Sequence, residues 1–381
     1  MKRNIYLDNN ATTFLAPSVI KKMSEALKIK NGNPSSVHSF GRKVKQDLIE
    51  IREDIASFLQ INPKELIFTS GGTESLNMIM RGIFEPKYSG HLISSNLEHS
   101  SVYETSLFLK NNGCHLTLLE GGLYGAVSPE DVQKSIRPDT KLIVLTAVNS
   151  ETGVKADIEN IASIAYENGI PFLVDGVALM GKEIFHIPKG VSAMCFSAHK
   201  FHGPKGVGMA FLRPSIKINP LLFGGGQEYN KRSGTENVLG IIGMHEAIRL
   251  LKSELPEASK KMESLRNRFE RKIMDKIPEV NVNGKGPRIA NTSNLAFPNV
   301  GGESLLMNLD LEGLAASHGS ACSSGGVEIS RILLNMNIPP SLAKNSIRFS
   351  FSRFTTEKEA DESAEIILRV VSQMQERNGL K

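Results

Sequence analysis

The sequence predicts an α/β protein built on a mostly parallel β-sheet. From about residue 65 to residue 212, short apolar runs alternate with amphipathic stretches of helical spacing. Such alternation is typical of a sheet that helices cover on both faces. Polar residues follow several of the apolar runs, and ligands of α/β sheets bind beyond the carboxyl ends of the strands. The pattern that gives the fold class therefore also indicates where a site is expected.

The N-terminal region is expected to contain two helices. Residues 1–14 are predicted to be irregular, with a possible edge strand in IYLDNNATT, and a helix over residues 17–30 opens at Pro17. The segment GNPSSVHSFGRKV is predicted to be a polar loop that carries Arg42. The long amphipathic helix after it has core positions at helical spacing, namely Val44, Leu48, Ile51, Ile55 and Leu59.

Seven strands are predicted for the sheet. Their apolar runs are ELIFT, HLISS, HLTLLE, KLIVLT, IPFLVD, VSAMCF and GMAFLR. Helices are expected between them, including one near residues 101–110 and one over IENIASIAYE. Gly169 follows that last helix and can adopt the left-handed conformation that ends it.

A second, smaller α/β domain is predicted at the C-terminus. A long helical region with a weak break at Pro256 leads into a strand (TSNLAFP), a helix (ESLLMNLDLEG) and a small-residue loop (SHGSACSSGGVE). A short helix at 328–336, a strand (SIRFSFS) and a final helix capped by Thr356 and Glu359 follow. With the boundary near residue 250, the large domain covers residues 15–250, and the small domain covers residues 1–14 and 251–381.

Composition excludes several classes of protein. The 381 residues carry a net charge of only +5 with no basic run interleaved with aromatics, so no nucleic-acid partner is expected. No apolar stretch approaches eighteen residues and the N-terminus lacks an apolar signal, so neither a membrane span nor secretion is expected. The three cysteines, Cys114, Cys195 and Cys322, form neither a disulfide framework nor a metal-ligand spacing. A reducing cytoplasm is the expected location.

Lys200 lies just beyond a predicted strand, between His199 and His202. Burial and nearby positive charge both lower the pKa of a lysine, which makes this amine a candidate nucleophile. The alternative is an ordinary surface lysine on a polar loop, and this stretch alone does not separate the two.

One predicted helix start and two predicted strand ends each have both a functional and a structural interpretation. Gly72 and Thr73 lie at a predicted helix start, which either binds phosphate through free N–H groups or is a plain helix cap. Asp175 ends a buried strand, where a carboxylate needs a donor or cation such as a protonated pyridine nitrogen, or else caps a loop. His99 follows another strand and either stacks on a flat ring and moves protons or is a satisfied loop histidine.

Two positions in the predicted small domain are candidates as well. The guanidinium fork of Arg348 suits a carboxylate, although it also suits a solvated strand face. Cys322 has small, polar neighbours, as an accessible reactive thiol or a tolerated surface cysteine would. Together with the lysine, the aspartate, the histidine and the helix start, these residues fit one cofactor, pyridoxal 5′-phosphate (PLP), acting on an amino acid.

The chain resembles the cysteine desulfurases, the NifS-like members of the class V aminotransferase family with PLP fold type I. The resemblance covers nearly the whole length and rests on YLDNNATT, NPSSVHSFGR, FTSGGTESLN, EHSSV, NSETG, VDG, FSAHKFHGPKG, RSGTEN, GSACSS and IRFSFSRFTTEKE, in the family's order. It implies the PLP-dependent transferase fold and conversion of L-cysteine to L-alanine. The sulfur would be held as a persulfide for an acceptor protein, such as an iron–sulfur scaffold.

The resemblance also implies roles for the cofactor-binding residues. Lys200 would hold PLP through a Schiff base and then move the α-proton of the substrate. Asp175 would pair with the pyridinium nitrogen, and His99 would stack on the ring. The phosphate would be bound by the Gly72 amide, Thr73, Ser197 and His199.

Further roles concern the substrate and a second subunit. Thr235 would reach the phosphate in the neighbouring subunit, which implies a homodimer. Arg348 would bind the substrate carboxylate. Cys322 would attack the substrate sulfur and keep it as a persulfide.

Two cofactor-binding positions depart from the family. Ser150 stands where the family has an asparagine that contacts the cofactor, and Ala178 stands where it has a glutamine that bonds the phenolic oxygen. Loss of one neutral hydrogen bond costs about 0.5–1.5 kcal/mol, so PLP binding is expected to survive. A selenocysteine lyase or other class V enzyme, and a weakly active PLP-binding scaffold for a sulfur acceptor, are the alternative functions.

Overall fold

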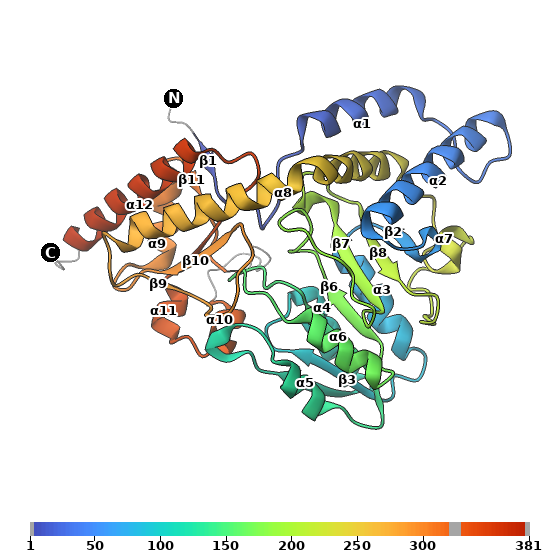
Figure 1. The fold of residues 1–381 in the computed structure, drawn as a ribbon, viewed down its shortest axis with the longest axis horizontal. Helices are drawn as coiled ribbons and strands as arrows, with labels where there is room; N and C mark the ends of the chain where they lie inside the picture. The colour runs from blue at the N-terminus through green and yellow to red at the C-terminus, as the bar shows by residue number, and fades with distance from the viewer. Residues whose placement is uncertain (1–3, 320–328, 378–381) are drawn as a thin grey trace.

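The structure is a computed structural model that describes residues 4–319 and 329–377 (Figure 1). Its larger part is built on a seven-stranded sheet with the strand order β2-β8-β7-β6-β5-β3-β4. β8 is antiparallel to both of its neighbours, and the other pairings are parallel. In that order the strands are Leu66–Thr69, Gly208–Leu212, Ala193–Ser197, Phe172–Asp175, Thr140–Thr146, His91–Ser95 and His115–Leu119. The predicted seven-stranded, mostly parallel sheet is confirmed.

Alternate residues of each strand supply two different cores. In β5, Ile143 and Leu145 belong to the core on one face, whereas Leu142 and Val144 belong to the core on the other. Both faces are apolar because helices cover both, which explains the unbroken apolar runs in the sequence.

The helices form two layers over this sheet. On one face lie α3 (Gly72–Phe84) and α4 (Ser100–Asn111), which pack against each other. The other face is covered by α1 (Pro17–Ile29), α2 (Ser39–Leu59), α5 (Pro129–Ser135), α6 (Ile158–Glu167) and the first half of α8 (Val238–Met274). The short helix α7 (Gln227–Asn230) precedes α8.

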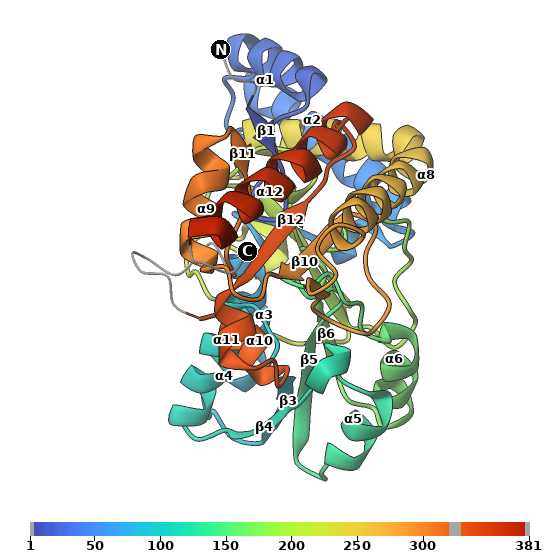
Figure 2. The same ribbon diagram turned by 90° about the vertical axis from the view of Figure 1, so that its left-hand side faces the viewer.

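A second core lies at the far end of α8. There a three-stranded antiparallel sheet has the order β12-β10-β9, and β1 pairs in parallel with β11. Figures 1 and 2 show α12 running beside the second half of α8 over these strands. The elements are β1 (Ile5–Tyr6), β9 (Asn281–Val282), β10 (Thr292–Ala296), α9 (Gly302–Leu311), β11 (Leu314–Ala315), α10 (Arg331–Asn335), α11 (Pro340–Lys344), β12 (Ser346–Ser350) and α12 (Glu357–Arg377). The domain boundary near residue 250 stays a prediction.

The structure corrects two details of the sequence interpretation. α2 begins at Ser39, because the His38 side chain accepts a hydrogen bond from the Gly41 N–H, so Arg42 lies on the helix and not in the predicted loop. α8 continues through Pro256 as one 37-residue helix. No helix in the described ranges has the length and apolar character that crossing a membrane requires.

Candidate active site

One cavity of about 210 Å³ lies where the carboxyl ends of the central strands meet the start of α3 and the strand β12. Ten residues predicted from the sequence line it: Gly72, Thr73, His99, Ser150, Asp175, Ala178, Ser197, His199, Lys200 and Arg348. Thr235 is exposed on the segment between α7 and α8, outside this cavity. Cys322 lies outside the described residues.

Lys200 ends a single 3₁₀ turn, residues 198–200, directly after β7. Its Nζ donates hydrogen bonds to the backbone carbonyl oxygens of Asn10 at 2.6 Å and Ala11 at 2.9 Å. The lysine amine therefore faces the N-terminal segment after β1, whose residues Asn10 and Ala11 line the cavity. The surface-lysine alternative is excluded.

A second lysine, Lys182, lines the same cavity and was not identified from the sequence. Its side chain is fully buried, and its Nζ donates to the Lys200 carbonyl oxygen at 2.7 Å. Burial, and then the positive charges of Lys200 and Arg353, lower the pKa of Lys182 to about 7. Sequence pattern gives no signal for it, because its contact with Lys200 depends on how two loops meet.

Asp175 is the last residue of β6 and is 5% exposed. Its Oδ1 accepts a hydrogen bond from the Val177 N–H at 2.9 Å. Burial raises the pKa of this carboxyl, and the charges of His99 and Lys200 and the Val177 hydrogen bond oppose that rise. A cation placed in the cavity would stabilise the charged carboxylate further.

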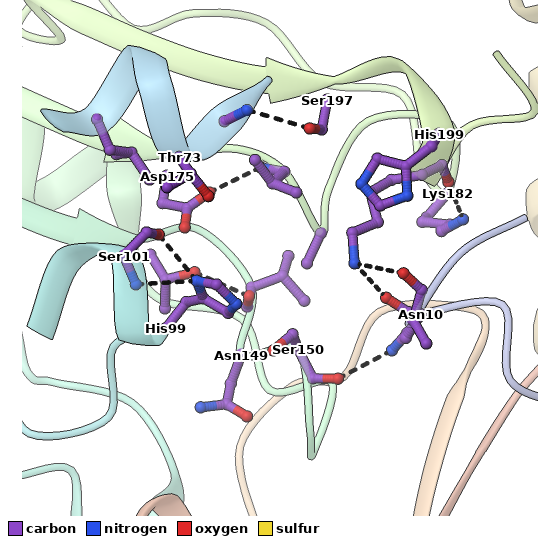
Figure 3. Close-up of a pocket in the computed structure, with 18 of the residues that line it drawn as sticks. Asn10, Thr73, His99, Ser101, Asn149, Ser150, Asp175, Lys182, Ser197 and His199 are labelled. Atoms are coloured by element: carbon purple, nitrogen blue, oxygen red, sulfur yellow. Dashed lines mark hydrogen bonds between the residues drawn. The ribbon is translucent and has the colours of Figure 1, made fainter. Parts of the chain in front are cut away.

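His99 is the N-cap residue of α4, and Figure 3 shows it beside Asp175 on one side of the cavity. Its Nδ1 accepts a hydrogen bond from the Ser101 N–H at 3.2 Å and lies 2.8 Å from the Ser101 hydroxyl. Since Nδ1 is an acceptor, a neutral His99 carries its proton on Nε2.

The start of α3 provides an anion-binding cradle. Its N-cap residue, Gly71, has no side chain to cap the first N–H groups, and the Gly72 N–H donates to the Ser197 hydroxyl at 3.1 Å. A Cβ at position 72 would lie only 2.5 Å from Cγ2 of Val177, so any residue other than glycine would force Val177 to shift. Burial, followed by nearby lysines, lowers the pKa of His199 to about 4, so this imidazole is neutral at pH 7 and can donate one hydrogen bond.

Arg348 enters the cavity from β12 and is 2% exposed. Its Nη1 donates to the Ser150 carbonyl oxygen at 3.1 Å, and Asn10 Nδ2 donates to the same oxygen at 3.1 Å. The backbone of residue 150, and not its side chain, therefore joins this loop to its neighbours. Ala178, on the turn after β6, brings no polar group to the cavity.

These residues fit PLP. A buried carboxylate, an imidazole and a lysine amine surround one cavity, and a helix N-terminus whose glycine packs closely against Val177 opens onto it. A pyridinium nitrogen, an aromatic ring, an aldehyde and a phosphate are the groups that such a set can hold.

Comparison with known proteins gives consistent matches along the chain. The family described as Aminotransferase class-V matches residues 5–362. The chain is 43% identical over 382 residues to a protein named cysteine desulfurase IscS from Dictyoglomus turgidum, with 98% of this chain and 96% of that protein covered. A protein of the same name from Methanosarcina thermophila is 37% identical, with 99% and 94% covered. A solved structure titled NifS-like protein superposes with a TM-score of 0.90 at 33% identity, covering 97% of this chain and all of that one.

Proposed function

The chain belongs to the aminotransferase class-V family and, within it, to the cysteine desulfurases, and on this basis we propose how its residues act. The enzyme is PLP-dependent and takes sulfur from L-cysteine. The assignment of residues rests on one observation: Lys200, Asp175 and the start of α3 lie around one cavity.

Lys200 is the residue that we propose to hold PLP covalently through Nζ. Asp175 pairs with the pyridinium nitrogen, and this cation offsets the burial that otherwise raises the pKa of the carboxyl. His99 would stack on the ring, and a neutral His99 carries its proton on Nε2. The phosphate would be held at the start of α3, where Gly72, Thr73, Ser197 and His199 would supply donors.

Arg348 binds the α-carboxylate of L-cysteine in this proposal, because a guanidinium binds a carboxylate in two parallel hydrogen bonds. PLP supplies the electron sink that stabilises negative charge on the substrate carbons. The Lys200 amine would take and return the α-proton. The Asn10 and Ala11 carbonyl oxygens then hold its ammonium group.

Cys322 is the proposed sulfur acceptor. Its thiolate attacks the substrate sulfur, an S–S bond forms, and the C–S bond breaks with its electron pair left on carbon. That carbon is protonated, so one L-cysteine and one thiol give one L-alanine and one persulfide. An acceptor protein then removes the outer sulfur.

The proposal also covers the oligomeric state of the enzyme, its sulfur acceptor and its cellular location. Thr235 is exposed in the single chain, which agrees with a role at the phosphate of a second subunit in a homodimer. Named relatives include IscS proteins, which favours sulfur supply to an iron–sulfur scaffold. The proposed compartment is the cytoplasm.

The test is an assay of the purified protein with L-cysteine and a thiol reductant, in which alanine and sulfide are measured together. Equal amounts of both are expected from the wild type, and Cys322→Ser should lose both while it keeps the visible PLP absorbance. Lys200→Ala should lose the absorbance of the covalently held cofactor. Activity of Cys322→Ser on selenocysteine alone would favour the lyase alternative, and a wild type that binds PLP but forms no alanine would favour the scaffold.

A further inference from the structure

Arg348 is held in place by Asp8, a residue to which the function above gives no role. Nη2 of Arg348 donates to Oδ1 of Asp8 at 2.9 Å. The arginine side chain is 3% exposed and that of Asp8 is 18% exposed. This ion pair is mostly removed from water, so its charges are screened less than those of a surface pair.

The backbone places Asp8 beside the arginine. Asp8 forms a parallel bridge with Ser350, the Ser350 N–H donates to the Leu7 carbonyl oxygen at 2.7 Å, and the Asn10 N–H donates to the Ser350 hydroxyl at 2.9 Å. Ser350 lies two residues after Arg348 on β12. The backbone of Asp8 is therefore fixed beside β12, and its short side chain places the carboxylate against Arg348.

The guanidinium of Arg348 keeps donors for a ligand. It has five N–H groups, of which Asp8 accepts from Nη2 and the Ser150 carbonyl from Nη1. Nε has no hydrogen-bond partner in the described part of the chain. Because Arg348 lines the cavity, a carboxylate there can bind the N–H groups that Asp8 and Ser150 leave.

We propose that Asp8 is a positioning residue that sets how strongly Arg348 binds the α-carboxylate of an amino acid in the cavity. The proposal rests on the carboxylate-binding role proposed for Arg348. The hydrogen bond from Arg348 to Asp8 fixes the orientation of the guanidinium, which favours binding. The negative charge of Asp8 opposes a second carboxylate at the same cation, which weakens binding.

Substrate and product respond alike, because L-cysteine and L-alanine both carry the α-carboxylate. An interaction that stabilises substrate, product and transition state equally changes KM with little change in kcat. Asp8 therefore sets the affinity for the product as well as for the substrate, and its negative charge is the part that limits the retention of L-alanine.

The experiment measures the equilibrium binding of L-alanine to the PLP-loaded protein by calorimetry, with no turnover involved. Asp8→Asn keeps an oxygen acceptor but removes the charge, so L-alanine should bind about threefold to tenfold more tightly than to wild type. Asp8→Ala also removes the acceptor, so it should bind L-alanine at least about tenfold more weakly than Asp8→Asn does. KM for L-cysteine should follow the same order. Equal binding by both variants and the wild type, or equal changes in both variants, would overturn the proposal.

Two control variants distinguish a wrong role of Asp8 from a wrong role of Arg348. Arg268 of α8 donates two hydrogen bonds, of 2.8 and 2.6 Å, to the carboxylate of Asp361 on α12. Asp361→Asn removes this carboxylate charge far from the cavity and should leave L-alanine binding unchanged. Arg348→Ala should weaken L-alanine binding. If it does not, the carboxylate role of Arg348 is wrong, and the role of Asp8 with it. If it does while both Asp8 variants bind as wild type, only the role of Asp8 is wrong.

Discussion

The side-chain amine of Lys182 donates a hydrogen bond to the backbone carbonyl of Lys200 at 2.7 Å, which places two lysines against each other inside the protein. The surroundings of Lys182 disfavour its charge, since burial is the largest influence on its pKa and the next two are cations. Folding therefore lowers the pKa of Lys182 from its ordinary value of 10.5 to about 7.

Replacement of Lys182 by methionine should change how stability depends on pH. Between pH 7 and 10.5 the unfolded chain binds a proton at Lys182 that the folded chain does not, so this lysine makes the free energy of unfolding rise with pH across that window. Urea unfolding of Lys182→Met at several pH values should show a smaller rise than the wild type. Lys217→Met, at an exposed position, should retain the full rise. Equal slopes in Lys182→Met and wild type would contradict the buried-lysine interpretation.

Replacement of Gly72 by alanine should weaken both the fold and the cofactor site. The new Cβ would lie 2.5 Å from Cγ2 of Val177, a stiff side chain, and the backbone N–H of the same residue donates to Asp175. Overpacking of this kind costs about 1–3 kcal/mol, measurable by denaturant unfolding, and PLP affinity should fall about tenfold. The double variant Gly72→Ala/Val177→Ala removes the contact and should recover most of both losses. If it recovers neither, the close contact is not the cause.

Replacement of Ala178 by glutamine should strengthen PLP binding. The added amide offers a donor to the cofactor, and one neutral hydrogen bond contributes about 0.5–1.5 kcal/mol, equivalent to about a twofold to tenfold lower Kd. Spectroscopic titration of the cofactor-free protein with PLP measures this change. Ala178→Leu has a similar volume without the amide and should show no gain. Equal affinities of the two variants would show that no hydrogen bond forms from position 178.

Residues at or just beyond the ends of buried strands can be identified from the sequence, because strand ends are visible in the apolar pattern. Asp175 and Lys200 are identified in this way, and the structure brings them to one cavity. Asp8 and Lys182 were missed as site residues, since their importance comes from contacts that no local pattern contains. Asp8 meets Arg348 across 340 positions of sequence. The role of Cys322 stays a prediction from the sequence.

The predicted helix boundaries were wrong where the usual capping signal was absent or where packing outweighed a local helix-breaking residue. Histidine is an uncommon N-cap residue, so the start of α2 after His38 was placed too late. Pro256 lacks an N–H and disfavours a helix interior by about 3 kcal/mol. Leu255 and Ala258 are buried beside it, and their packing outweighs this local cost.

The single carbonyl oxygen of Ser150 accepts hydrogen bonds from Asn10 and from Arg348. Three segments, from the beginning, the middle and the end of the chain, therefore meet at one atom. During synthesis on the ribosome, the first ten residues cannot take their final place until β12 has emerged, some 340 positions later. The end of the cavity that Arg348 lines is consequently among the last parts of the enzyme to form, whereas the strands that lead to Asp175 and Lys200 are complete much earlier.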